Sequence, residues 1–463
     1  MRVTALRIEP FEFINILDFS IEKSVNEHVT ARIVGIISAE KENEYVKQPA
    51  STRNVVINAR NRDGEEKILF NGLVCNVHIK YMNELRTLVV EAISHSYLMD
   101  ITEVTRTYQN DAMTYQDVTD IMKRDDENFA FLHPEFGGIP IGQMLVQYKE
   151  TNKAFVQRIA SKLNTCVVVD YALDIPYISI GMPKRRPLKD IAIQPLEYEM
   201  RKDVSGYLDL TAHNVSGVTE RDAVCHVFKS REVYDLCDPI AFKGLELYVY
   251  SVSSKLEGEE IVHTYTLKEK DGFVFKEAFN NQIIGASLYG TVKEIQNDMV
   301  RVQVFGDVAQ SELKWFSYST IYSTPDGTGW YFMPEVGDTI RLHFPTEHES
   351  DAYVTSSVHH QHGRRSNPDV KHITTVHGKT VTFRPDSIFM SNGAGSSIEL
   401  HDTAGIRLDT TGDINIVSDS NIRLHANGRI VVQGDKGVVV IQNGSVVNIA
   451  DSIDMASDHV RVK

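Results

Sequence analysis

Cysteine is scarce and scattered in this sequence. The 463 residues include four cysteines, and no two of them form a C-x-x-C pair or a regular spacing. A disulfide framework and a zinc-binding motif both depend on paired or regularly spaced cysteines, so neither is indicated. We expect Cys75, Cys166, Cys225 and Cys237 to be buried free thiols.

Long apolar runs and an excess of positive charge are also missing. No segment approaches the roughly 20 apolar residues that span a bilayer, and charged residues interrupt the N-terminal segment, so no signal peptide is predicted. The formal net charge is -15, which does not favour binding to the phosphates of nucleic acid. We expect a protein without a nucleic-acid partner that is made and folded in the cytoplasm, so that any export needs a machine of which the protein is a part.

No motif for catalysis is recognisable. Carboxylates are numerous, but none belongs to an evident acid/base pair, and no Ser or Cys has a nucleophile motif around it. We therefore predict that the protein is not an enzyme and needs no cofactor. His359, His360 and His362 form a cluster, which we interpret as part of a polar linker rather than as a metal site.

The length predicts several folded units. Domains usually run to roughly 100–200 residues, so 463 residues correspond to about three or more of them. Hydrophobic residues make up 42% and charged residues 24%, which is typical of folded protein. Apolar periodicity in the N-terminal half predicts two helices, Met113 to Arg124 and Asn152 to Leu163.

Two parts of the chain predict β-barrels. Ile68 to Leu73 resembles Ile240 to Leu245, and each is followed by apolar strand-like residues, so this internal echo predicts two related barrels. From Gly285 to Val358, short alternating segments lie around the Asn297-Asp298 turn and elsewhere, which predicts a small barrel of the oligonucleotide-binding kind. We interpret the aromatic residues from Trp315 to Tyr331 as barrel core and trimer packing.

An apolar pair returns every eight residues near the C-terminus. The pairs, which we predict to be the core of a needle, are Ile398/Leu400, Ile406/Leu408, Ile414/Ile416, Ile422/Leu424, Ile430/Val432 and Val438/Val440. Each pair alternates as in a strand and is followed by turn residues. Such short strands must stack to bury their apolar face. Either three octads of one chain make one coil, or three chains each contribute one face of a shared prism.

Three further segments carry a family resemblance. Ala92 to Asn110, Val146 to Ala160 and above all Met333 to Phe344 resemble the VgrG family of type VI secretion spikes and the related phage late-control and baseplate hub proteins. The resemblance covers nearly the whole chain. It implies a mainly β multidomain protein with two hub barrels, an α/β insert, an oligonucleotide-binding-type barrel and a trimeric β-helix needle.

This resemblance also implies a domain order. The expected parts are a first hub barrel (1–110), an α/β insert (111–200), a second hub barrel (201–280), a baseplate barrel (285–358), a linker (359–375) and a needle (376–463). The gap from about Val358 to Val376 is too short for the lysozyme domain that some phage members carry. At His459 the residue two positions later is Arg461, so the His-x-His iron pair of some phage spikes is incomplete and no metal is expected.

The partners follow from the same resemblance. A homotrimer is expected to bind an inner tube protein of the Hcp kind at its hub, baseplate proteins around it, and a PAAR-type cap on the tip formed by Val460, Arg461, Val462 and Lys463. The chain stops at Lys463 without an effector domain, so cargo is expected to travel on the cap. The alternative is a trimeric tail spike that binds or cleaves surface polysaccharide.

Overall fold

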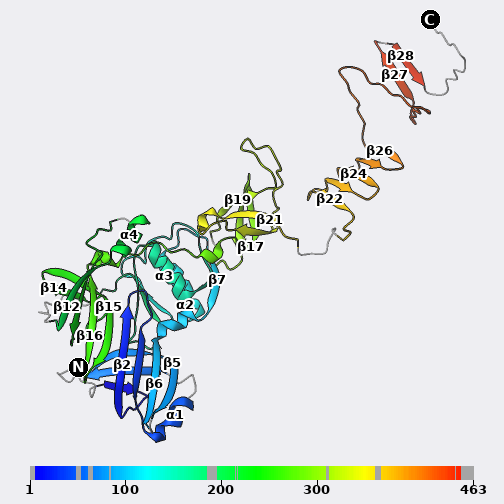
Figure 1. The fold of residues 1–463 in the computed structure, drawn as a ribbon. Coiled ribbons are helices and arrows are strands. Elements are labelled where there is room, and N and C mark those ends of the chain that lie inside the picture. Colours follow the sequence, from blue (N-terminus) through cyan, green and yellow to red (C-terminus); the bar gives the residue numbers. More distant parts are fainter. Residues whose placement is uncertain are drawn as a thin grey trace. The chain divides into compact units, whose positions relative to one another are not determined.

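The structure is a computed structural model that describes residues 6–47, 54–60, 66–82, 85–184, 195–213, 215, 217–308, 312–359, 366–443 and 445–449. The chain divides into two compact units, residues 1–359 and 360–463, and each is described by itself. Strands dominate both units (Figure 1), as predicted. No helix in the described ranges is long and apolar enough to span a membrane.

An eleven-stranded sheet forms much of the first unit. Its strand order is β1-β4-β5-β6-β3-β2-β15-β16-β13-β12, with β14 also paired to β15. The bounds are β1 (Leu6–Glu9), β2 (Asn15–Ser24), β3 (Thr30–Ile36), β4 (Asn54–Arg60), β5 (Glu66–Met82), β6 (Leu85–Ser94), β12 (Glu197–Lys202), β13 (Val224–Ser230), β14 (Pro239–Phe242), β15 (Leu245–Glu257) and β16 (Glu260–Lys268).

This sheet contains a tandem repeat. Repeat 1 consists of β2 to β6 and repeat 2 of β12 to β16, and the order β2-β3-β6-β5-β4 matches the order β12-β13-β16-β15-β14. Both also share a β-bulge: the register shifts opposite β6 between Val74 and Asn76, and opposite β16 between Val249 and Ser251. Counted back from the hairpin turns, these shifts fall at the same place, so the two repeats correspond strand by strand.

The repeat differs from the sequence prediction in two ways. Hydrogen bonds between β2 and β15 join both halves into one continuous sheet rather than two separate barrels. The echo that predicted them is also out of register. Ile240 pairs with Leu247 in repeat 2 as Val55 pairs with Gly72 in repeat 1, so Ile240 corresponds to Val55 and not to Ile68. The two repeats are therefore related by their strand order, and the similar segments Ile68 to Leu73 and Ile240 to Leu245 are not at corresponding positions.

An α/β insert lies between the repeats in the chain. It contains η4 (His95–Asp100), β7 (Glu103–Tyr108), α2 (Tyr115–Asp125), β8 (Ala130–Leu132), β9 (Leu145–Thr151), α3 (Asn152–Lys162), β10 (Val167–Val169) and β11 (Tyr177–Ile180). Both predicted helices are confirmed. α2 follows Thr114, which forms a capping box with Asp117, and the side chain of Thr151 caps α3. Two short helices were not predicted, α1 (Glu42–Lys47) and α4 (Val204–Ala212).

A closed five-stranded barrel completes the first unit, as predicted. Its order is β17-β18-β19-β21-β20, from β17 (Ser287–Gln296), β18 (Met299–Val304), β19 (Trp315–Ser319), β20 (Thr339–His343) and β21 (Tyr353–Ser357). Val292, Val302 and Leu342 are buried in its core. Trp330 and Tyr331 lie instead on the loop before β20 and are exposed, so assigning them to the barrel core was wrong.

The second unit begins with a five-stranded antiparallel meander. It consists of β22 (Lys371–Thr374), β23 (Thr380–Phe383), β24 (Ser387–Ser391), β25 (Ser397–His401) and β26 (Gly405–Asp409), each paired with the next. Residues 410–437 contain no strand. A hairpin of β27 (Val438–Gln442) and β28 (Ser445–Ile449) follows.

The four cysteines are free thiols. Cys166 and Cys237 are buried, as expected, and burial raises the pKa of Cys166 to about 12. Cys225 is half-buried, and Cys75 is exposed at the bulge of β5, so the prediction of burial is wrong for Cys75.

Candidate functional site

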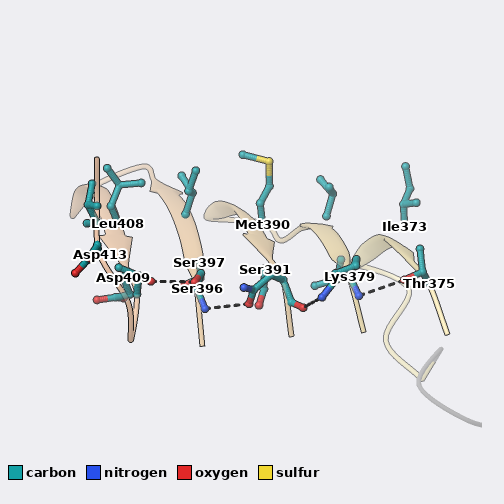
Figure 2. A pocket seen from close by; sticks show the side chains of 16 residues that line it. Ile373, Thr375, Lys379, Met390, Ser391, Ser396, Ser397, Leu408, Asp409 and Asp413 are labelled. Atoms are coloured by element: carbon teal, nitrogen blue, oxygen red, sulfur yellow. Dashed lines mark hydrogen bonds between the residues drawn. The ribbon is translucent and has the colours of Figure 1, made fainter. Parts of the chain in front are cut away.

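The meander has one apolar face. Because opposed residues of paired strands point to the same side, the register aligns two rows of side chains across the five strands. One row is Ile373, Val381, Met390, Ile398 and Leu408, and the other is Lys371, Phe383, Ile388, Leu400 and Ile406. Figure 2 shows Ile373, Met390 and Leu408 projecting to the same side of the sheet. They lie along an open depression of about 690 Å³.

The opposite face of the meander is mainly polar, with Phe389 as an apolar exception. Thr382 lies between His372 and Phe389 there, and Glu399 pairs with Arg407 in the register. A hydrogen-bonded row of turn residues fixes one end of the sheet: Lys379 N donates to Thr375 Oγ1 (3.2 Å), and Ser396 N donates to Asn392 Oδ1 (3.0 Å) (Figure 2). The meander is therefore a regular sheet with one face suited to water and one suited to a protein interior.

The predicted needle residues fall into three groups, of which two lie on strands. Ile398/Leu400 and Ile406/Leu408 lie on β25 and β26, where the two pairs oppose each other on the apolar face. Val438 and Val440 lie on β27, which pairs with β28 as an antiparallel hairpin. The predicted tip, Val460 to Lys463, lies outside the described residues.

The third group differs from the buried strands that the octads predicted. These three pairs have irregular backbone within residues 410–437, and their side chains are exposed on the single chain. The exposed fractions are 58% for Ile414, 70% for Ile416, 53% for Ile422, 72% for Leu424, 53% for Ile430 and 68% for Val432. The physical reason is that, in the described part of one chain, no strand pairs with this segment to order its backbone and cover its side chains. A core made of these six residues therefore stays a prediction for an assembly of chains.

Sequence reasoning missed the three strands before the octads. Their signal was present, because Val381/Phe383 and Ile388/Met390 repeat the one-and-three spacing of apolar residues. Asp386, a turn residue, lies between these two pairs. The spacing from one pair to the next is seven rather than eight, which hid them from a search for a strict octad.

A buried ionic network joins the insert to the barrel. Arg158 of α3 donates from Nη1 to Glu349 Oε1 (2.9 Å), from Nε to Glu150 Oε1 (3.1 Å) and from Nη2 to the carbonyl oxygen of Val146 (2.7 Å). Lys162 Nζ lies 3.5 Å from Glu349 Oε2. Burial opposes the charge of Arg158, but its bonds to Glu150 and the charges of Glu150 and Glu349 outweigh that effect and raise its pKa.

A second buried polar cluster lies where the two repeats meet. Lys67 Nζ is 3.2 Å from Asp235 Oδ2, Tyr171 donates its hydroxyl to the same carboxylate, and the ammonium of Lys23 lies 3.3 Å from the centre of the Tyr171 ring. Burial would raise the pKa of Asp235, yet the charges of Lys67 and Lys23 hold it below its usual range. His263 is also buried and bonds to Ser254 Oγ.

No arrangement for catalysis or metal binding emerges from these groups. In the part of the chain that the structure describes, no three His, Cys, Asp or Glu side chains are placed to hold a metal ion. His359 belongs to the described residues, whereas His360, His362 and His459 lie outside them. Among the described residues, the feature that stands out is the uncovered apolar face of the meander, and such faces are typical of protein interfaces.

Comparison with known proteins identifies the fold. No family model matches the chain, and no curated protein matches its sequence. Among solved structures, the E. coli c3393 protein, described as a type VI secretion component similar to the T4 bacteriophage tail proteins gp27 and gp5, matches at 13% identity and a TM-score of 0.52, covering 76% of this chain and 99% of that chain.

Chains of a Francisella complex match over still more of the sequence. The half-lidded PdpA-VgrG complex matches at 9% identity with a TM-score of 0.53, covering 87% of each chain. The lidless form matches at 10% identity with a TM-score of 0.51, covering 85% of this chain and 93% of that chain. These matches extend over most of the chain, so the predicted resemblance is confirmed at the level of the fold.

Proposed function

We propose that this protein is the structural hub and spike of a contractile injection machine of the type VI secretion or phage tail kind. Three copies form the working unit. The first unit of each copy contributes to a hub that meets an inner tube of the Hcp kind, and the second unit contributes to a needle. The protein acts by joining the tube to a piercing tip, with no catalytic step.

The observation that carries this proposal is the apolar face of the meander. Nine apolar side chains lie on it in two rows, and none of the described residues of the second unit covers it. Eight of them are exposed and Val381 is half-buried. Fully burying a side chain of this size contributes roughly 1.5–3 kcal/mol, so leaving this face uncovered would be very costly. Three copies with their apolar faces turned inward bury all of them in one prism.

The lack of strands in residues 410–437 favours a needle shared by three chains over a coil formed by one chain. If three octads of one chain formed a coil, a single chain would bury its own apolar pairs. Instead residues 410–437 contain no strand, and their apolar pairs, such as Ile416 and Leu424, are exposed. Strands that pair only with other copies explain this, because the described part of a single chain supplies no partner strand for them. The proposed needle is therefore an intertwined β-helix that forms when three chains assemble.

The further partners are part of the same proposal. The tube and baseplate proteins bind the hub, and a PAAR-type cap that carries the cargo binds the tip at Val460 to Lys463. The support for the cap is the sequence pattern alone: Val460 and Val462 repeat the one-and-three spacing of the apolar pairs. The edges of a strand with this spacing would accept further strands from a partner.

Light scattering of the purified full-length chain tests the proposal. The expected mass is three times 52.2 kDa. Met390→Asp places three carboxylates at the centre of the shared apolar core and should abolish the trimer. Ser391→Asp is the matched control, because its side chain lies on the polar face of the same strand. A wild-type monomer, or a Met390→Asp trimer as stable as the control, would contradict the proposal.

A further inference from the structure

One loop of the barrel carries a cluster of exposed aromatic rings. The loop, residues 320–333, follows β19 and precedes β20. The rings are those of Tyr322, Trp330, Tyr331 and Phe332, with exposed fractions from 45% for Trp330 to 69% for Tyr331. We call these four side chains the ring cluster. Trp and Tyr combine a large apolar surface with a polar tip, so a group of them open to water on the single chain indicates a binding surface.

Hydrogen bonds hold the ring cluster in place. Trp330 N donates to the carbonyl oxygen of Tyr322 (2.8 Å), and Thr320 Oγ1 donates to the carbonyl oxygen of Trp330 (2.8 Å). The hydroxyl of Tyr331 donates to the carbonyl oxygen of Asn297 (2.9 Å), in the turn between β17 and β18. The loop is therefore ordered in the free chain, and a ligand does not have to order it on binding.

The ring cluster borders an open depression of about 760 Å³. Its lining comes from the turn at Asn297 and Asp298, from Tyr318 and Ser319 at the end of β19, and from the loop that carries the rings. Among the described residues, no hydrogen bond or ion pair occupies the side chains of Asn297 and Asp298. An amide and a carboxylate are thus available to a ligand that lies against the rings.

The place of this depression in the barrel limits the candidate ligands. Five-stranded barrels of the oligonucleotide-binding kind bind oligonucleotides and oligosaccharides on the face of the second and third strands and on the loop between the first and second. In this barrel the third strand is β19, and the first loop is the turn at Asn297 and Asp298. Both line the depression, so these two classes of ligand are the ones to compare.

The charges around the depression decide between the two classes. None of the described residues that line it is a lysine, an arginine or a histidine, whereas Asp298 contributes a carboxylate. Asp326, within the same loop, is a second one, and hydrogen bonds from Thr324 and then Thr328 lower its pKa to about 2. A phosphate backbone needs cationic partners and would be repelled here. Sugar hydroxyls instead donate to carboxylates, and the apolar C–H face of a sugar ring stacks on an aromatic ring.

We propose that the ring cluster, Asn297 and Asp298 form a binding site for an uncharged polysaccharide. The rings stack against consecutive sugars, while the amide and the carboxylate bond to their hydroxyls. The site binds without making or breaking a covalent bond. It goes beyond the hub and spike function and is compatible with it, because it uses none of the residues on the apolar face of the meander.

Affinity electrophoresis of the full-length chain tests this site. Native gels are cast with increasing amounts of dextran, mannan, laminarin or glycol chitin, and at least one of them should retard the wild type. Trp330→Ala and Tyr322→Ala should each raise the apparent dissociation constant about tenfold, because each removes one stacking ring. Phe305→Ala is the matched control, since Phe305 is an exposed aromatic residue after β18 that does not line the depression.

Each outcome supports or overturns the site. Retardation that both loop variants weaken and Phe305→Ala leaves unchanged supports it. No retardation of the wild type by any of the four polysaccharides overturns it, as does retardation that is equal in all three variants. Binding of oligo(dT) that depends on Trp330 would assign the depression to nucleic acid instead. Loss of assembly in Trp330→Ala, measured by light scattering, would assign the rings to a contact with a second copy, which also overturns the proposal.

Discussion

At the scale of single residues, Arg158 connects the insert to the barrel. Its side chain is 5% exposed, and it bonds to the carboxylates of Glu150, which is 11% exposed, and Glu349, which is 4% exposed. Removing one partner of a buried ion pair leaves the other charges without compensation, which costs more than the pair itself contributes. The network therefore makes the insert and the barrel one unit of the fold.

We expect Arg158→Met to destabilise the first unit by about 3–5 kcal/mol, because Glu150 then loses its cationic partner and Glu349 keeps only Lys162, while both carboxylates stay buried. Denaturant unfolding followed by tryptophan fluorescence measures the change, since Trp315 begins a barrel strand. Arg221→Met is the matched control: Arg221 also bonds to a carboxylate, Glu269, but is exposed, and exposed pairs contribute about 0–1 kcal/mol. If both substitutions lowered the free energy of unfolding equally, the buried network would contribute no more to stability than an exposed ion pair.

His263 provides a pH-dependent contribution at the same scale. Burial, followed by the charges of Lys23 and other cationic groups, lowers the pKa of His263 to about 3 from an unfolded value of 6.5. Between these values the unfolded chain binds a proton that the native state excludes, so stability falls as the pH decreases from 6.5 towards 3 and is unaffected by this group above 6.5.

His263→Asn tests this contribution, because asparagine can still bond to Ser254 but does not titrate. The thermal midpoint of the wild type should fall more steeply between pH 7 and pH 5 than that of the variant. Parallel midpoint curves for the two proteins would contradict the assignment. All other titrating groups are common to the wild type and the variant, so a difference between their midpoint curves reports on His263 alone.

At the scale of elements, the same apolar spacing has two outcomes in the second unit. From β22 to β26 the strands form hairpins with their own neighbours, so one chain completes the sheet and exposes one face. From Ile414 to Val432 the spacing continues, but no hairpin forms within the described chain. The proposed trimer explains both, because a hairpin needs one chain whereas a shared coil needs three.

Ile422→Asp should therefore prevent formation of the needle without unfolding the first unit. Three copies would place three carboxylates in one core layer, which is unfavourable in an apolar interior. Circular dichroism and light scattering together measure the result: strand signal from the first unit is retained while the trimer is weakened or lost. Arg423→Asp is the control, since residue 423 alternates away from the core positions 422 and 424. A trimer of unchanged stability in Ile422→Asp would refute the predicted core.

At the scale of the whole molecule, the tandem repeat would give the proposed trimer six similar units. Each chain carries two copies of the same five-strand order, joined by β2 and β15. In the proposed trimer this arrangement lets a spike with threefold symmetry meet a tube ring with sixfold symmetry. A tail spike that binds polysaccharide has no need of this repeat, which favours the hub over that alternative.

Several features of the fold could be predicted from the sequence alone. The β-rich class, both long helices and the five-stranded barrel follow from local periodicity, capping residues and turn residues such as Asn297-Asp298. These signals are readable because each depends on residues close together in the chain. The tertiary structure decided the register of the repeat and the sharing of one sheet by both halves. These features depend on hydrogen bonds between strands far apart in the sequence, such as β2 and β15, where no local pattern specifies the partner.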